Sequence, residues 1–152
     1  MPQVSSLYDQ DFYAWAMEQA ELLRAGKLSA ADIEHIAEEI ESMGRTEKRE
    51  LVSRLAVLLM HLLKWKFQPE RRSKSWTATI SIQRRDLADH LIDNPSLKAG
   101  LPDAIKGAYS RALLSAVAET DLPQATFPED CPWTIEQIMN EEFWPSDAER
   151  VQ

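Results

Sequence analysis

One stretch of the sequence limits the folds open to this chain more than any other. Between Arg45 and Phe67, large apolar residues recur at helical spacing, and further apolar residues widen the stripe to much of the helix circumference. The stripe consists of Leu51, Leu55, Leu58, Leu62 and Trp65, and it is widened by Val52, Leu59 and Leu63. A helix that is apolar on so many sides has to be covered by other helices, so we expect it at the centre of a bundle.

The rest of the chain also has helical periodicity, and the sequence shows no strand pattern. We predict helices over residues 9–25, 29–43, 45–67, 73–92 and 102–117, with a break at Gly44 between the second and the third. Either Ser73 or Ser75 is expected to cap the fourth helix. Three prolines then mark an irregular segment, and Thr134 with Gln137 resembles a capping box that opens a short helix. We therefore expect one all-α domain over residues 1–152, with a bundle of about five helices at about 7–120 and a C-terminal arm at about 121–152.

The composition is that of a globular protein. The chain has 152 residues, of which 44% are hydrophobic, and this suffices for one core. No apolar run approaches the roughly 18 residues of a membrane span, and residues 1–12 lack the basic and apolar regions of a secretory signal. A lone cysteine, Cys131, fits a reducing compartment. These features predict a cytoplasmic protein that does not associate with a membrane.

Charge is distributed unevenly along the chain. The net charge is −8, yet residues 45–85 carry 11 basic and 3 acidic groups. Residues 1–43 carry 2 basic and 9 acidic groups, and residues 86–152 carry 4 and 13. Either these segments pair within one molecule or the basic middle faces an anionic partner. The overall negative charge argues against nonspecific binding to nucleic acid.

In the basic middle, the segment Leu62–Trp76 interleaves five cations with aromatic residues. The first two cations end a helix, where positive charge offsets the macrodipole. Arg71, Arg72 and Lys74 instead crowd the start of the next helix, where the dipole is already positive and an anion would offset the repulsion. The candidate binding residues are therefore Lys66, Arg71, Arg72, Ser73, Lys74 and Trp76.

Three kinds of anion would satisfy this cluster. The first is the chain's own acids, such as Glu141 and Glu142 on the arm. The second is the acidic surface of a partner protein. The third is a phosphate-bearing ligand or nucleic acid, which the net charge of −8 disfavours.

The three histidines raise the question of a metal between helices. The sequence contains neither a pair of Glu-x-x-His motifs nor His-Glu-x-x-His. If the second, third and fourth helices form antiparallel hairpins with a turn at Gly44, depth along the bundle can be counted from Gly44. His35 and His90 would then lie about 14 and 10 Å from the Gly44 end, and His61 would lie too far from them to share a metal. His35 and His90 are then the alternative metal ligands, together with Asp86, Glu38 or Glu39. His35, however, falls opposite the apolar face of its helix, and we expect it to point toward solvent. We assign no metal or cofactor on this basis.

The sequence contains no motif that identifies a catalytic site. Its four glycines form no phosphate-binding loop. Cys131 lies beside Asp130 and far from any histidine, which is typical of a small buried residue rather than a nucleophile. We identify no catalytic residue and favour a non-enzymatic protein.

Four segments together resemble a known family. They cover residues 7–26, 33–51, 61–76 and 127–139, and in that order they are similar to the bacterial family catalogued as domain of unknown function 29. The resemblance implies a bacterial, all-helical, cytoplasmic protein, and it places Arg71, Arg72, Ser73 and Trp76 within a family motif. It implies no reaction, cofactor or catalytic residue.

We therefore expect a protein-interaction module whose basic, aromatic helix–loop–helix surface binds a partner with an acidic surface. One alternative is a metal-dependent enzyme or metal-binding bundle, and another is a nucleic-acid-binding regulator. The sequence leaves the oligomeric state open, because the helix over 45–67 can be covered within a monomer or across a dimer.

Overall fold

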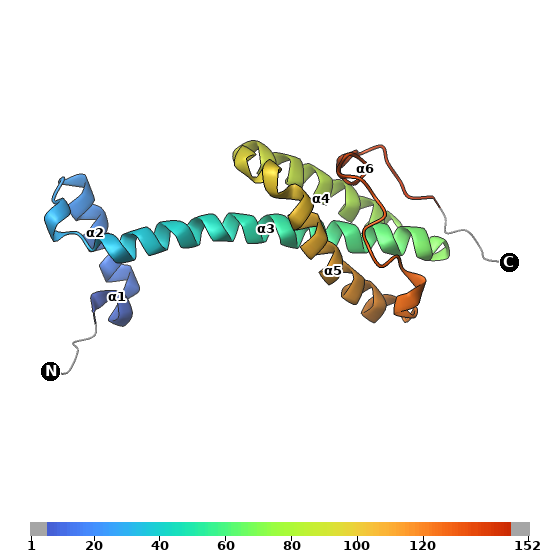
Figure 1. Cartoon of the computed structure of the whole chain (residues 1–152), viewed down its shortest axis with the longest axis horizontal. Helices are drawn as coiled ribbons and strands as arrows, with labels where there is room; N and C mark the ends of the chain where they lie inside the picture. The colour runs from blue at the N-terminus through green and yellow to red at the C-terminus, as the bar shows by residue number, and fades with distance from the viewer. Residues whose placement is uncertain (1–5, 147–152) are drawn as a thin grey trace. The chain divides into compact units, whose positions relative to one another are not determined.

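The chain is built of helices joined by short turns (Figure 1). The structure is a computed structural model that describes residues 6–146, and within that range it contains no strand, so the predicted all-α class is confirmed. Residues 1–5, where no secretory signal is expected, and 147–152, the end of the expected arm, lie outside the described residues. The chain divides into two compact units, residues 1–46 and 47–152.

The first unit contains a short helix, a longer helix and the start of a third. α1 (Leu7–Gln10) is followed at once by α2 (Phe12–Arg24). Asp11 separates them, because its side chain caps α2 by accepting a hydrogen bond from a backbone N–H three residues later at 3.0 Å. The single helix predicted over 9–25 is therefore two helices. Gly26, at φ 72°, follows the end of α2, in a conformation that glycine adopts without strain.

α3 (Ile33–Phe67) runs through Gly44 without interruption, so the predicted break there is wrong. A helical glycine costs about 1 kcal/mol relative to alanine, which is too little to end a helix between good helix formers. The Glu41–Arg45 ion pair, with an N–O distance of 3.5 Å, spans the glycine and supports the helix. A break would have needed a second signal, such as a proline.

A polar network centred on Asp32 holds the first unit together. The Asp32 carboxylate accepts hydrogen bonds from the indole N–H of Trp15 at 3.1 Å and from the backbone N–H of His35 at 3.3 Å. Asp32 therefore caps the start of α3. Its backbone N–H donates to the side-chain oxygen of Gln19 at 2.7 Å. Trp15 and Gln19 are the buried residues of α2, so the interior of this unit is small and partly polar.

Large apolar side chains of the first unit are exposed on α3. Ile33, Ile40 and Met43 are 53%, 62% and 67% exposed. The side of α3 that packs here carries His35, whose ring stacks on Tyr8 of α1 with centroids 4.0 Å apart. The expectation that His35 points to solvent is therefore wrong, because α1 and α2 cover the polar side of α3 and leave its apolar stripe uncovered.

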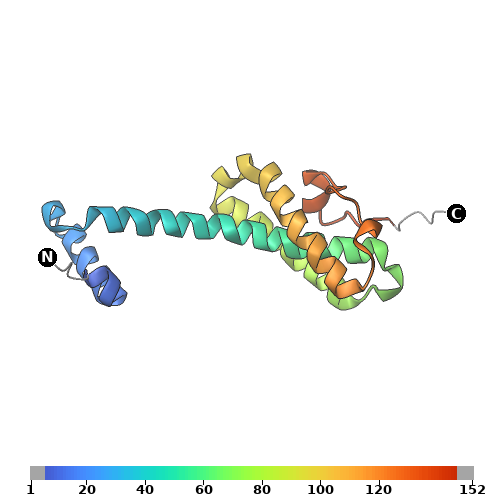
Figure 2. The same ribbon diagram turned by 60° about the horizontal axis from the view of Figure 1, so that its bottom comes forward.

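The second unit contains the hydrophobic core. The C-terminal part of α3 lies beside α4 (Lys74–Asp93), and α5 (Leu101–Thr120) crosses α3 obliquely (Figures 1 and 2). Ser73 caps α4 by accepting a hydrogen bond from the backbone N–H of Trp76 at 3.2 Å. The predicted central position of this part of α3 holds for five leucines with no exposed surface: Leu55, Leu58, Leu59, Leu62 and Leu63.

α3 and α4 form an antiparallel hairpin whose loop is centred on Glu70. Residues at equal sequence distances from Glu70 meet across the hairpin. Lys64 lies over the ring of Trp76, 4.9 Å from its centroid, and Arg54 pairs with Asp86 at 3.0 Å. This register determines which polar side chains of the two helices come together.

One buried arginine attaches the C-terminal arm to α4. Arg84 is 1% exposed and donates hydrogen bonds to three backbone carbonyl oxygens, those of Gln137 at 3.2 Å, Ile138 at 2.8 Å and Phe143 at 2.7 Å. The arm contains α6 (Ile135–Met139), which begins with the capping box that the sequence predicts. Figure 1 shows this segment beside α4.

Candidate functional site

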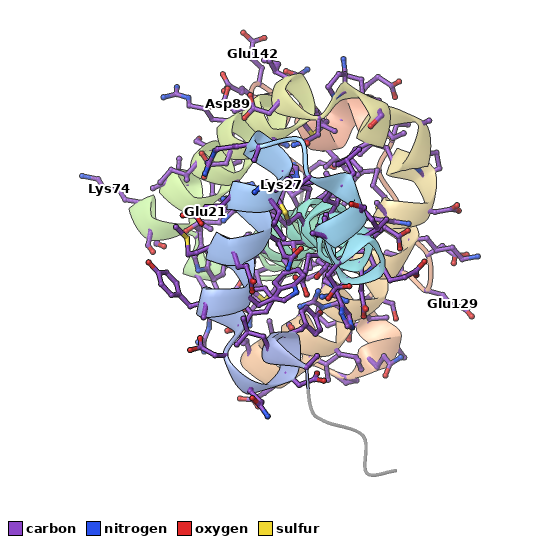
Figure 3. All side chains as sticks on the ribbon, turned by 90° about the vertical axis from the view of Figure 1, so that its left-hand side faces the viewer. Glu21, Lys27, Lys74, Asp89, Glu129 and Glu142 are labelled. Carbon is purple, nitrogen blue, oxygen red and sulfur yellow. The ribbon has the colours of Figure 1, made fainter. Side chains whose placement is uncertain are left out.

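The basic segment, Leu62–Trp76, covers the end of α3, the hairpin loop and the start of α4. Arg71 and Lys74 are exposed, and Figure 3 shows Lys74 extending away from the ribbon. Among the described residues, neither of these two cations forms an ion pair. Ser73 is exposed, but its hydroxyl is occupied as the cap of α4. The segment therefore presents two cations to solvent.

Other cations of this segment are used inside the second unit. Arg72 donates from Nε to the carbonyl oxygen of Trp65 at 2.8 Å, and its guanidinium lies over the Trp65 ring at 4.7 Å from the centroid. Lys64 pairs with Glu119 of α5 at 3.2 Å. Lys66 lies 5.6 Å from the ring centroid of the adjacent Phe67. These contacts favour a structural role for much of the segment.

One acid of the arm, Glu141, acts on Arg84 of α4, which lies outside the predicted basic cluster. Glu141 raises the pKa of Arg84, partly offsetting the lowering caused by burial. Trp144 of the arm packs on Trp65, with ring centroids 4.5 Å apart. Within the described residues, the arm therefore contacts the segment through this aromatic pair, and Glu141 acts on Arg84 of α4.

The three histidines have separate environments. The Nδ1 atom of His35 lies 2.6 Å from the Asp32 carboxylate, which raises the pKa of His35. His61 lies half-buried on α3, where its Nδ1 donates to the carbonyl oxygen of Val57 at 2.8 Å and burial lowers its pKa. His90 is 8% exposed and belongs to the second unit, whereas His35 belongs to the first.

His90 lies against two glutamates of α3 instead of the predicted His35. Its Nε2 lies 2.8 Å from the carbonyl oxygen of Glu47, and its Nδ1 lies 3.6 Å from the Glu47 carboxylate and 3.8 Å from the Glu50 carboxylate. Ligand atoms of these three residues all lie within 4.8 Å of one another. They form the candidate metal-binding group that the described part of the chain brings together.

A polar cavity of about 220 Å³ adjoins this group. Its walls carry one cation, Arg54, and five further residues: Glu50, Asp86, Asp89, His90 and Asp93. Arg54 donates from Nε and Nη2 to Oε1 of Glu50, at 3.0 and 2.8 Å. Because Oε1 is held in this way, the second carboxylate oxygen of Glu50 faces His90.

Two members of the alternative metal set, Asp86 and His90, line this cavity, whereas the third, His35, lies in the first unit. Glu47 and Glu50 were missed because helix positions were counted from a break at Gly44. Counting from the hairpin loop at Glu70 instead places Glu50 opposite His90, twenty residues away on either side. The sequence therefore contains the spacing that pairs Glu50 with His90. Using that spacing requires knowing that the chain turns at Glu70 and not at Gly44.

The larger cavities flank α5 and the arm. One of about 440 Å³ is lined by Tyr109 and Cys131 among others. Burial raises the pKa of Cys131 and also that of Tyr109, the latter to about 12. Both groups therefore stay protonated at neutral pH, which agrees with the reading of Cys131 as a packing residue.

The described residues define an all-helical protein with a leucine-rich core and a half-buried polar pocket at the α3–α4 hairpin. Residues 7–144 match the model of the family described as domain of unknown function DUF29, so the chain belongs to this family and the resemblance is confirmed. No curated protein and no solved structure matches the chain. Within residues 6–146, every helix falls short of the combined length and apolar character of a membrane span.

Proposed function

We propose that this protein is an interaction module that binds a protein partner on the apolar surface of its first unit. One observation carries the proposal. Of the twelve large hydrophobic residues that are exposed in the described part of the chain, nine lie between residues 7 and 43. Exposed apolar residues scattered singly are normal, but their concentration on a small unit is typical of a contact surface.

The exposed residues of α3 form a helical seam. Ile33, Ala37, Ile40 and Met43 follow one another at spacings of three and four residues, so they lie along one face of the helix. All four are exposed. This spacing is that of a helix that packs against another helix. We call these four residues the N-terminal seam.

Charge indicates the chemistry of the partner. Residues 1–43 carry 9 acidic and 2 basic groups, and Glu34, Glu38 and Glu41 beside the seam are exposed. Two copies of this surface would repel each other, and nucleic acid or an anionic membrane would be repelled as well. A partner helix with an apolar face flanked by lysine or arginine is complementary to it.

The basic segment is a second candidate surface. Arg71 and Lys74 are exposed and would bind an acidic partner, as the sequence suggests. Arg72 and Lys66 already contact aromatic rings of their own unit, so they offer less to a partner. The N-terminal seam therefore ranks first.

The test compares binding by three forms of the full chain. Ile33→Ser/Ile40→Ser/Met43→Ser removes the seam, and Ile82→Ser/Ile92→Ser/Leu114→Ser is the matched control, because those residues are 56%, 72% and 64% exposed in the second unit. A partner isolated with wild type is purified and titrated against each form. We expect the seam variant to bind at least about tenfold more weakly, the control to bind like wild type, and affinity to fall with added salt.

Four outcomes would contradict the proposal. Equal binding by the seam and control variants places the contact elsewhere. Loss of binding only in a fourth form, Arg71→Glu/Lys74→Glu, assigns the contact to the basic segment. Light scattering that shows a wild-type dimer and a monomeric seam variant makes a second copy the occupant. If nuclease treatment removes the material that the wild-type chain captures, the result favours the alternative of a nucleic-acid-binding regulator.

A further inference from the structure

We propose that Glu47, Glu50 and His90 form a binding site for one divalent transition-metal ion, with Zn²⁺ as the best match to the donor set. This site lies within the second unit and does not depend on the proposed function of the first. It uses one imidazole and two carboxylates, which are ligands that Zn²⁺ takes in proteins.

The hydrogen bond of His90 determines which nitrogen is available. A backbone carbonyl oxygen can only accept, so the contact at 2.8 Å from His90 Nε2 to the Glu47 carbonyl requires a proton on Nε2. In the neutral ring, Nδ1 then carries a lone pair. Histidines that bind metals almost always donate their other N–H to such an acceptor, which fixes the ring orientation and the tautomer.

The free nitrogen points at two further acceptors. Nδ1 lies 3.6 Å from Oε2 of Glu47 and 3.8 Å from Oε2 of Glu50, and both distances exceed a hydrogen bond. If Nδ1 were protonated and paired with either carboxylate, the N–O distance would be about 2.8 Å. The geometry instead leaves room for a cation between three ligand atoms, on a histidine whose ring is more than nine-tenths buried.

The distances from His90 Nδ1 to the two carboxylates are close to those between ligands of one metal ion. Two ligands about 2.1 Å from a tetrahedral Zn²⁺ lie about 3.4 Å apart, so the observed 3.6 and 3.8 Å need to close by only a few tenths of an ångström. The side chains of Glu47 and Glu50 are 46% and 40% exposed, which leaves them free to make that adjustment. A fourth position would remain for water.

The surroundings hold Glu50 in place and favour a cation. Arg54 holds Oε1 of Glu50, so that Oε2 is the oxygen presented to His90. Arg54 is itself anchored by Asp86 at 3.0 Å. The adjoining cavity carries four carboxylates against one guanidinium, so its charge favours a cation.

The test uses the full chain without a histidine tag, stripped with a chelator and titrated with Zn²⁺ in a calorimeter. Glu47→Gln/Glu50→Gln removes both carboxylates. Glu38→Gln/Glu41→Gln is the matched control, because it changes the same charges at the same spacing on the same helix. Circular dichroism verifies that both variants fold, and NMR follows the imidazole resonances of each histidine.

We expect wild type and the control to bind one Zn²⁺ per chain, and the Glu47→Gln/Glu50→Gln variant to bind at least about tenfold more weakly. The resonances of His90 should shift at one equivalent, whereas those of His35 and His61 should not. Co²⁺ in place of Zn²⁺ should give the intense visible absorption of a low-coordinate site. Absence of stoichiometric binding, equal binding by the carboxylate variant, or shifts centred on another histidine would each overturn the assignment.

Discussion

Arg84 shows how one residue can attach a segment that has little secondary structure. Its guanidinium satisfies three carbonyl oxygens of the arm, and α6 has only five residues with which to satisfy its own backbone groups. A buried carbonyl without a partner costs about 1–3 kcal/mol, so the arm depends on this side chain. Sequence reasoning missed Arg84 because its spacing resembles that of an ordinary surface arginine.

Replacing Arg84 by methionine should lower the free energy of unfolding by about 3–5 kcal/mol, because several buried carbonyl groups lose their donor at once. Arg85→Met is the control, since Arg85 is exposed and its loss should change stability by no more than about 0.5 kcal/mol. Urea unfolding of both variants measures the difference. Equal stability of the Arg84→Met and Arg85→Met variants would mean that water can donate to the arm's carbonyl oxygens in place of Arg84.

The Asp32–His35 pair makes the first unit sensitive to pH. Asp32 raises the pKa of His35 above its usual 6.5, chiefly through their hydrogen bond, and the same bond lowers the pKa of Asp32 below 3.8. A raised histidine pKa gives stability that is complete below 6.5 and lost as pH rises through the folded value. A lowered aspartate pKa gives stability that is present above 3.8 and lost as pH falls through the folded value. The pair therefore stabilises most between these values.

An NMR titration should place the His35 midpoint above 6.5 in wild type and return it toward that value in Asp32→Asn. The difference in the free energy of unfolding between wild type and Asp32→Asn should shrink as the pH rises through the His35 midpoint. His61 serves as an internal control, because burial moves its pKa in the opposite direction. An unchanged His35 midpoint in Asp32→Asn would show that the ion pair does not form in solution.

At the scale of elements, two glycines that look alike in the sequence behave differently. Gly44 lies in α3, and a Cβ added there would meet nothing within 4 Å. Gly26 has equal space but a φ of 72°, which side chains adopt only with strain. Local backbone conformation, and not crowding, is what separates these two positions.

Gly44→Ala should therefore stabilise the chain by about 0.5–1 kcal/mol, because alanine has the higher helix propensity. Gly26→Ala should destabilise it by about 1 kcal/mol, because it forces alanine into the left-handed region. Thermal unfolding of both variants tests the pair. Destabilisation by Gly44→Ala would contradict a continuous α3.

At the scale of the whole molecule, apolar residues are divided unequally between the two units. The second unit encloses a core that runs from Leu51 to Ile138. The first unit buries Trp15 and exposes nine large apolar residues. That imbalance is why we place the partner contact on the first unit. The excess of acidic groups in residues 1–43 opposes self-association through these apolar side chains.

Part of the candidate metal site was predictable and part was not. His90 belongs both to the alternative metal set of the sequence and to the proposed site, whereas Asp86, one helical turn before it, lines the adjoining cavity and pairs with Arg54. The residues of α3 that lie opposite them depend on the register of the α3–α4 hairpin. A helix break wrongly predicted at Gly44 shifts this register by many residues. The stripe at Ile33 and Ile40 illustrates a second limit, because periodicity shows that a face is apolar but does not show what covers it.

The sequence by itself determined the all-α class, the capping box at Thr134, the end of α2 shortly before Gly26 and the central place of the leucine-rich stretch within its unit. These features depend on hydrogen bonds and dihedral preferences among residues a few positions apart, or on how apolar a helix is. Only the tertiary structure decided that His90 meets Glu47 and Glu50, and that Arg84 holds the arm. Such contacts join residues tens of positions apart, and their pairing is fixed by how the helices pack and not by any local preference.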